Sequence, residues 1–273
     1  MMKGLVTTLI LFCLMFSVLG CAEQTPDFEI AFLETGDSDC IVIQTPDSVI
    51  MIDTAYDSSF EKIKTYLDNQ QIAKIDYLIL THFDKDHVGS AASIINSCEV
   101  GEVIAPNYEK QSEYMTALSE SVQAKKVKYS KISEDVNIEL NGVRLWISAP
   151  QESYYENENN YSLIVSLKYE GYSFLFMGDA LKLRTQEFVN YADFEEWSYC
   201  LIKAPHHGDY SKPIKAIYES CPLQYCVITT DMPDNVGNKL IELNKELDVK
   251  PFYTFNGDVF VAISNGELKV SQR

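Results

Sequence analysis

The chain has 273 residues, of which 46% are hydrophobic, and its excess of acidic residues gives a formal net charge of −18 at pH 7. This charge argues against tight binding to DNA, because two polyanions repel each other at a distance. A small anionic substrate remains open, since exposed charges more than about 8 Å away are largely screened at physiological salt while a metal ion acts locally.

The N-terminus predicts export and a lipid anchor. Lys3 is followed by residues 4–20, none of which is charged, and this run is shorter than the roughly 20 residues that a membrane-spanning helix needs. The run leads into the sequence VLGC, which ends at Cys21 and resembles a bacterial lipobox. We therefore expect a lipoprotein signal peptide over residues 1–20 and a lipid on Cys21 that anchors the chain to the bacterial membrane, at the cell surface or in the periplasm. A secretory peptide followed by an incidental cysteine is the alternative.

Residues 21–273 are expected to form one domain, because no long linker, repeat or low-complexity segment divides them. Apolar or alternating runs predict strands at 28–34, 40–44, 48–53, 75–80 and 103–105, and helical spacing predicts helices at 58–69, 90–97 and 114–122. A middle rich in hairpins has expected strands at 126–129, 136–140, 143–148, 161–169 and 172–177. The last third alternates helices at 183–191, 213–219 and 239–247 with strands at 199–204 and 225–229, and two final strands lie around Asn256-Gly257. This order predicts two sheets packed face to face with helices outside.

The cysteines carry little information about function. Five follow Cys21, at positions 40, 98, 200, 221 and 226, and five thiols cannot all pair. A disulfide between Cys221 and Cys226 is possible in an oxidising compartment, but buried free thiols are the favoured interpretation. Their spacing does not match a zinc-thiolate site.

The four histidines of the chain fall in two short segments, with His82 and His87 in the first and His206 and His207 in the second. Each segment follows an expected buried strand, and a rigid strand fixes the geometry of the side chains on the loop after it. The first segment, THFDKDHVG, also carries two aspartates, so four ligand-type side chains lie within six residues. For this segment alone, a solvated acidic loop is the alternative.

Asp179 marks a third point of the same kind. It follows the strand expected at 172–177, in the sequence MGDA. Imidazole and carboxylate ligands suit zinc, manganese or iron better than calcium, which prefers oxygen alone. Three strand ends that converge on one edge would therefore build a metal site from Asp179 and the two histidine segments.

These motifs resemble those of the metallo-β-lactamase superfamily, in the form found in the extracytoplasmic hydrolase domain of the ComEC DNA-uptake competence family. The resemblance rests on HxDxDH at 82–87, Gly178-Asp179 and HHG at 206–208, supported by FLETG at 32–36, Asp39, IDT at 52–54 and NYSL at 160–163. Thr254 with Asn256-Gly257 resembles the closing hairpin of the family. It implies an α/β fold over residues 21–273, a four-layer αββα sandwich of two packed mixed sheets with helices outside.

The resemblance also implies ligands for two divalent metal ions, zinc or manganese. The first ion would be held by Asp86, His87, Asp179 and one histidine of the 206–207 pair, for which we choose His207; the second would be held by His82, Asp84 and the bridging Asp179. Asp84 stands where many relatives have histidine, and no histidine remains for the usual middle ligand. The carboxylate content makes manganese as reasonable as zinc.

The expected reaction follows from charge. Two divalent ions against three carboxylates leave a local excess of about one positive charge, which can receive an anionic phosphate. We therefore predict an extracytoplasmic metal-dependent hydrolase, a phosphodiesterase or nuclease-like enzyme that uses a metal-activated water. Asp86 is expected to orient the water, and His206, if it is not a ligand, to donate a proton to the leaving group. Asn160 and Ser162, two apart on an expected strand, are assigned to substrate contact.

Two other functions remain open: hydrolysis of a lactam or lactone ring at the same site, and metal binding by a lipoprotein without catalysis. The expected partner is a small or polymeric phosphoester. Lys125, Lys126 and Lys128 form the basic cluster of the sequence, and we interpret it as a solvated surface rather than a nucleic-acid patch. No protein partner can be inferred.

Overall fold

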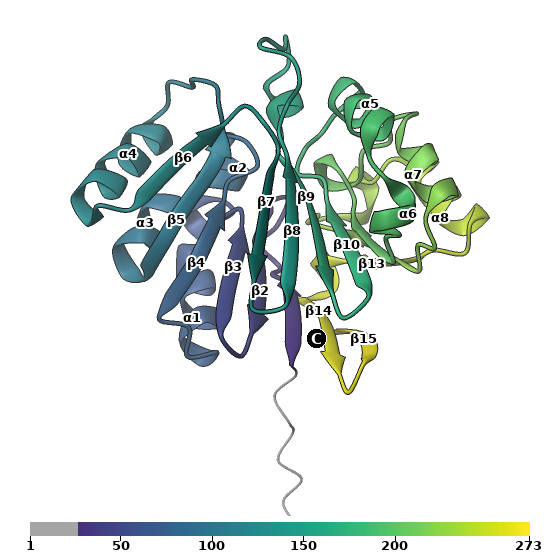
Figure 1. The fold of residues 1–273 in the computed structure, drawn as a ribbon, viewed down its shortest axis with the longest axis horizontal. Coiled ribbons are helices and arrows are strands. Elements are labelled where there is room, and N and C mark those ends of the chain that lie inside the picture. Colours follow the sequence, from purple (N-terminus) through teal and green to yellow (C-terminus); the bar gives the residue numbers. More distant parts are fainter. Residues whose placement is uncertain (1–26) are drawn as a thin grey trace, which may run out of the picture.

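Two β-sheets pack face to face and helices cover the outer side of each (Figure 1). This computed structural model describes residues 27–273, so the expected signal peptide and Cys21 lie outside the described residues. One sheet has eight strands in the order β15-β14-β1-β2-β3-β4-β5-β6, and the other has seven in the order β13-β12-β11-β10-β9-β8-β7. Both sheets contain parallel and antiparallel pairs. The predicted four-layer αββα sandwich of two mixed sheets is therefore confirmed.

The eight-stranded sheet consists of β1 (Phe28–Phe32), β2 (Ile41–Thr45), β3 (Ser48–Ile52), β4 (Lys74–Ile79), β5 (Glu99–Pro106), β6 (Lys128–Ile132), β14 (Val259–Ser264) and β15 (Glu267–Gln272). The seven-stranded sheet consists of β7 (Val136–Leu140), β8 (Val143–Ser148), β9 (Ile164–Tyr169), β10 (Tyr172–Phe176), β11 (Leu201–Lys203), β12 (Tyr225–Ile228) and β13 (Lys250–Tyr253). The helices are α1 (Phe60–Asn69), α2 (Lys85–Val88), α3 (Ala91–Ser97), α4 (Glu113–Lys125), α5 (Lys182–Tyr191), α6 (Phe194–Trp197), α7 (Ile214–Ser220) and α8 (Asn238–Glu246).

Alternate side chains of the strands build the core between the sheets. Phe28 and Phe32 of β1 point toward the seven-stranded sheet, whereas Ala31 packs on the opposite face. Phe174 and Phe176 of β10 meet these rings, with centroids 5.7 Å apart for Phe28–Phe174 and 6.0 Å apart for Phe32–Phe176. Successive side chains of a strand point to opposite faces, so one strand supplies both this core and an outer layer. Burial of each ring contributes roughly 1.5–3 kcal/mol.

Helices bury the outer faces of the sheets. In Figure 1, α1, α3 and α4 lie on the left against the eight-stranded sheet, and α5 to α8 lie on the right against the seven-stranded one. Helix α1 buries Ile63 and Leu67, which are four residues apart and so share one side of the helix. Because the central strands are covered on both faces, ligands reach them at the strand ends.

The strand ends with the predicted site residues lie at one edge of the sandwich. Strands β3 and β4 run parallel, and so do β10, β11 and β12. The loop after β4 carries His82, the loop after β10 carries Asp179, and the loop after β11 carries His206 and His207. Ligand sites of α/β sheets characteristically form beyond the carboxyl ends of such strands.

Two elements near the site differ from the prediction. The helix expected at 90–97 is α3, but the short helix α2 lies inside the first histidine segment, where none was expected, with Asp84 as its N-cap residue. The strand expected at 161–169 begins only at Ile164, because residues 158–161 form a short 3-10 helix, η2 (Glu158–Tyr161). Apolar periodicity does not resolve such single turns at an element boundary.

The prediction for the last strands is also partly wrong. Asn256-Gly257 does not close a hairpin, because β13 before it belongs to the seven-stranded sheet and β14 after it to the eight-stranded sheet. The closing hairpin of β14 and β15 turns at Asn265-Gly266 instead. Both dipeptides have the same turn composition, and only the pairing of distant strands distinguishes them.

The cysteines in the described part of the chain are free thiols. Cys200 and Cys226 are buried free thiols, and burial raises the pKa of each to about 11, as expected for inert packing residues. Cys221 is free as well, so the disulfide considered from the sequence is not formed.

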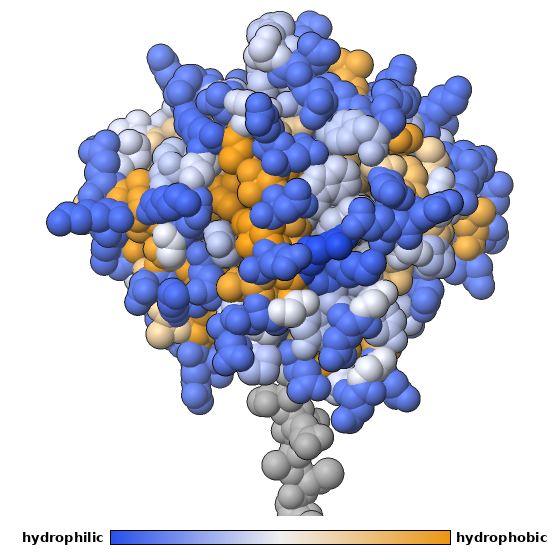
Figure 2. All heavy atoms as spheres, viewed as in Figure 1, coloured by the Kyte–Doolittle hydropathy of each residue, from blue (hydrophilic) through white to orange (hydrophobic). Residues whose placement is uncertain are grey.

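Hydrophilic residues cover most of the face seen in Figure 2, with hydrophobic ones near its middle. Between residues 27 and 273, every helix is too short or too polar to cross a membrane.

Candidate metal centre

The first histidine segment folds so that its two imidazoles lie together. The ring centroids of His82 and His87 are 4.1 Å apart. Phe83 turns the other way into the core, where it is 1% exposed and stacks on Tyr108 at 4.6 Å. Asp84 then begins α2, whose single turn brings His87 back beside His82. A buried aromatic anchor and a short helix therefore fix both imidazoles.

Gly178 allows Asp179 to approach this segment closely. Its φ is +50°, and a Cβ atom there would lie 2.8 Å from the Cβ of Thr81, so only glycine fits. The backbone N–H of Asp179 donates to Ser162 Oγ at 3.1 Å. The Gly178 carbonyl accepts from the backbone N–H of His206 at 3.0 Å, which joins the loop after β10 to the loop after β11.

The second histidine segment has a strained backbone. His206 and His207 have φ angles of 45° and 54°, in the left-handed region that costs a non-glycine residue of order 1–3 kcal/mol. Surrounding contacts fix both rings. His207 Nδ1 donates to the Thr229 carbonyl at 2.9 Å, and His206 Nδ1 lies 2.6 Å from Asp209 Oδ2. With Nδ1 occupied, each Nε2 is left to face the site.

All four histidines surround the carboxylate of Asp179. Its Oδ1 lies 3.2 Å from His87 Nε2. Its Oδ2 lies 3.6 Å from His207 Nε2, and 3.9 Å from both His82 Nε2 and His206 Nε2. The three separated stretches of chain therefore meet at one point, as the sequence predicts.

Two further aspartates complete the donor set. Asp86 Oδ2 is 3.4 Å from His207 Nε2 and 3.9 Å from His87 Nε2. Asp84 Oδ2 is 3.6 Å from His82 Nε2. The residues expected to hold the first ion have ligand atoms that all lie within 4.8 Å of one another: Asp86, His87, Asp179 and His207.

Unpaired atoms indicate that this set fits metal ions. In the described part of the chain, Nε2 of His82, His87 and His207 and Oδ1 of Asp179 are buried without a hydrogen-bond partner. Buried polar atoms almost always have a partner, so four orphans at one point require an explanation such as an ion. Imidazole nitrogen and carboxylate oxygen are ligands of zinc, manganese and iron. We conclude that the residues present fit divalent metal ions.

The electrostatics of the site favour bound positive charge. Burial by itself would lower the pKa of His87, but Asp179 and Asp53 outweigh it and raise that pKa well above its usual value. The pKa of His207 is raised in the same way, because Asp179 and Asp86 outweigh its burial. Burial would raise the pKa of Asp179, yet His87 and His207 hold it well below its usual value. Protons on the imidazoles balance the carboxylates, and a metal ion that binds must displace them.

A second layer of polar residues orients the candidate ligands, and sequence reasoning did not assign it this role. Asp53 Oδ2 lies 2.7 Å from His87 Nδ1 and accepts from Thr81 Oγ1 at 2.7 Å. Asp39 Oδ1 accepts from Thr229 Oγ1 at 2.6 Å, and the carbonyl of the same threonine receives His207 Nδ1. Such outer partners fix the tautomer and direction of a metal-binding histidine.

Lys203 is the residue of this layer that sequence reasoning missed most clearly. Its Nζ forms an ion pair with Asp39, donates to the Gly178 carbonyl at 3.2 Å and lies 3.9 Å from Asp179 Oδ1. Both members of the Lys203–Asp39 pair are buried. A signal was present, because a lysine within the apolar run LIKA must have a buried partner if the strand is buried.

Asn160 and Ser162 do not lie on a strand, so the reason for assigning them to the substrate is wrong. Asn160 belongs to η2, and its Oδ1 accepts from the backbone N–H of Arg184 at 3.2 Å. Ser162 Oγ accepts from Asp179, as described above. Both side chains are buried. Their contact with a substrate stays a prediction.

Comparison with known proteins agrees with this geometry. A family model described as the metallo-beta-lactamase superfamily matches residues 33–217. ComE operon protein 3 of Bacillus subtilis (strain 168) is 27% identical over 148 residues, which cover 52% of this chain and 18% of that protein. The similarity to the ComEC family that the motifs implied is therefore confirmed, over a minor part of the relative.

Solved structures share the fold at low sequence identity. YhfI from Bacillus subtilis, described as a metallo-beta-lactamase fold protein, has a TM-score of 0.56 at 10% identity, covering 84% of this chain and 98% of its own. A putative metal-dependent hydrolase from Parabacteroides distasonis ATCC 8503 has a TM-score of 0.51 at 14% identity, covering 83% and 92%. CmlA, a diiron β-hydroxylase from Streptomyces venezuelae, has a TM-score of 0.55 at 10% identity, covering 88% and 55%. With its sandwich fold, its candidate metal ligands at three strand ends and a family model that spans most of the domain, this chain belongs to the metallo-β-lactamase superfamily of metal-dependent hydrolases.

Proposed function

We propose that this protein is an extracytoplasmic phosphodiesterase, nuclease-like in its chemistry, that uses two divalent ions of zinc or manganese. The observation that carries the proposal is the convergence of four imidazoles on Asp179, with four buried ligand atoms that lack a partner. Two divalent ions against the carboxylates of Asp84, Asp86 and Asp179 would leave about one positive charge, which suits a phosphate group.

Residues of the chain supply the remaining chemistry. When bound, the ions lower the pKa of a coordinated water toward about 7 and polarise the phosphoryl oxygen. Asp86 would accept a hydrogen bond from the attacking water and orient it toward phosphorus. His206 is 34% exposed in its side chain, and Asp209 fixes its ring, so its Nε2 can donate a proton to the leaving-group oxygen.

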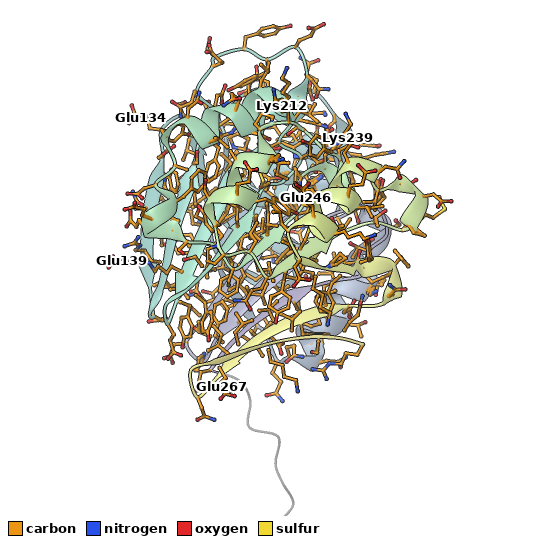
Figure 3. All side chains as sticks on the ribbon, turned by 90° about the vertical axis from the view of Figure 1, so that its right-hand side faces the viewer. Glu134, Glu139, Lys212, Lys239, Glu246 and Glu267 are labelled. Carbon is orange, nitrogen blue, oxygen red and sulfur yellow. The ribbon has the colours of Figure 1, made fainter. Side chains whose placement is uncertain are left out.

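A pocket with three lysines would offer positive charge to an anionic substrate. It has a volume of about 420 Å³ and is lined by Tyr210, Lys212, Lys215 and Lys239, and also by Glu242 and Glu246. Figure 3 shows Lys212 and Lys239 on the same side of the molecule. Tyr210 follows His207 by three residues, so the pocket adjoins the second histidine segment. In a chain of net charge −18, this is where a part of the substrate next to the scissile phosphate would find positive charge.

The proposed location rests on the N-terminal sequence. Cleavage after residue 20 would leave a lipid on Cys21, and the exported domain would then act at the membrane surface. Labelling with a palmitate analogue in a bacterial host tests this directly: label should enter the wild-type chain and not Cys21→Ser.

The reaction is tested by turnover with defined metals. The metal-free exported chain is loaded with Mn²⁺ or Zn²⁺ and assayed on bis-p-nitrophenyl phosphate, on a dinucleotide and on nitrocefin. We expect phosphodiester cleavage that Asp179→Asn lowers by at least about 100-fold, while Asp248→Asn, which changes an aspartate outside the site, has no effect. Cleavage of nitrocefin without phosphodiester cleavage would instead support a lactam hydrolase, and bound ions without any turnover would support a binding protein.

A further inference from the structure

The ammonium group of Lys110 pairs with one carboxylate oxygen of Asp84, the aspartate that stands where many relatives have a ligand histidine. Lys110 lies between β5 and α4, and its Nζ forms an ion pair with Asp84 Oδ1. The same Nζ lies 2.6 Å from Glu158 Oε2, at the start of η2. The Lys110 side chain is 24% exposed, so it sits at the rim of the site rather than in open solvent.

The two oxygens of Asp84 therefore have different surroundings. Lys110 takes Oδ1 on the outer side. Oδ2 faces His82 Nε2 at 3.6 Å, and that nitrogen is one of the buried atoms without a partner. An ammonium group bound to one oxygen fixes the rotation of the carboxylate and directs the other oxygen inward, as outer partners do for metal ligands in general.

Lys110 also offsets negative charge at the site. A carboxylate in place of a neutral imidazole adds one negative charge beside Asp86 and Asp179. The ammonium group of Lys110 carries the opposite charge and lies between Asp84 and Glu158, so it offsets part of the charge of both carboxylates.

We propose that Lys110 is a positioning residue for the second metal ion: it binds one oxygen of Asp84 and leaves the other available as a ligand atom in the place of an imidazole nitrogen. This inference rests on the second ion of the proposed function. It gives a physical reason for the departure of Asp84 from the common ligand pattern. It also joins η2 to the metal centre, since Glu158 holds Lys110 from the other side.

Metal binding tests the inference without any substrate. Mn²⁺ is titrated into the metal-free exported chain, and the number of ions and the affinity of each are measured by calorimetry and by metal analysis. Lys110→Met should weaken the second ion about 10- to 100-fold, the usual effect of losing an outer partner, and leave the first within about twofold. Lys110→Arg should restore most of the affinity.

Lys64→Met is the matched control. Its side chain is 30% exposed, but it pairs with Asp68 of the same helix, α1. This variant should bind both ions as the wild type does. The melting temperature of each metal-free variant, expected within about 2 °C of the wild type, shows whether the fold is intact.

The double variant Asp84→His/Lys110→Met separates orientation and charge from general damage. With an imidazole at position 84 no lysine is needed, so this variant should hold the second ion at least as tightly as the wild type. Equal affinities in the wild type and Lys110→Met, equal weakening of both ions, or failure of the double variant would each overturn the inference. If the wild type binds only one ion, both the second metal site and the inference are wrong. If the ions bind as expected but no phosphodiester is cleaved, only the proposed reaction is contradicted.

Discussion

Replacing Lys203 with methionine tests whether the buried layer behind the metal centre stabilises the fold. Lys203 and Asp39 are 0% and 1% exposed, and methionine fills a similar volume, so the change removes mainly a charge. Removing one partner of a buried ion pair costs about 3–5 kcal/mol, because the other charge stays buried without compensation. Asp39 retains its hydrogen bond from Thr229 at 2.6 Å. We therefore expect the lower end, about 3 kcal/mol.

The free energy of unfolding is measured by urea titration of the metal-free chain, followed by tryptophan fluorescence. Lys128→Met is the control, since its pair with Glu102 at 2.9 Å is exposed on the lysine side and such pairs contribute less than about 1 kcal/mol. Lys203→Met/Asp39→Asn should recover most of the loss, because it removes the stranded carboxylate. A loss below about 1 kcal/mol in Lys203→Met, or no recovery in the double variant, would refute the reasoning.

Three other results are expected. Because the pKa values of His87 and His207 are raised, protons must leave these imidazoles when Mn²⁺ binds, so the affinity for Mn²⁺ should rise between pH 6 and 8. The heat of binding at pH 7.5 should depend on the ionisation enthalpy of the buffer, and a heat that does not depend on it would argue against ligation by these imidazoles. Asp53→Asn should weaken the binding of the first ion about 10-fold or more, because His87 would lose the partner that orients its ring. A metal titration measures this affinity, and an unchanged value would exclude an orienting role for Asp53. Lys212→Ser/Lys239→Ser should raise the KM for an anionic diester several-fold with little change in kcat, and this increase should be smaller at 0.5 M salt. An unchanged KM would show that the pocket with these lysines does not bind the substrate.

The fold and the meeting of the candidate ligands were predictable because both follow from local patterns. Apolar runs end within two residues of His82, Asp179 and His206, so these side chains were expected on the loops at the ends of buried strands. The position of all four histidines in two short segments also indicated a metal site from the sequence alone. The short elements were less predictable, since α2 and η2 are single turns within loops.

The outer layer was not predictable in the same way, because its contacts join residues far apart in the chain. Asp39 meets Lys203 and Thr229, and neither partner can be chosen from spacing alone. The sequence predicts that Lys203 needs a partner but does not say which carboxylate provides it. Similarly, Asn256-Gly257 and Asn265-Gly266 look alike as turns, and the pairing of β1 with β14 decides which of them closes the hairpin.

The same outer partners also set the local charge at the centre. Carboxylates crowd it, and two lysines pair with them. The carboxylates are those of Asp39, Asp53, Asp84, Asp86, Glu158 and Asp179, and the ammonium groups are those of Lys203 and Lys110. Without the lysines, two divalent ions would leave this set with a charge of about −2, whereas with them it becomes about neutral. If the substrate is the proposed phosphodiester, the lysines therefore lessen the repulsion that its phosphate meets, although neither is itself a ligand, and the net charge of −18 on the whole chain does not set this local charge.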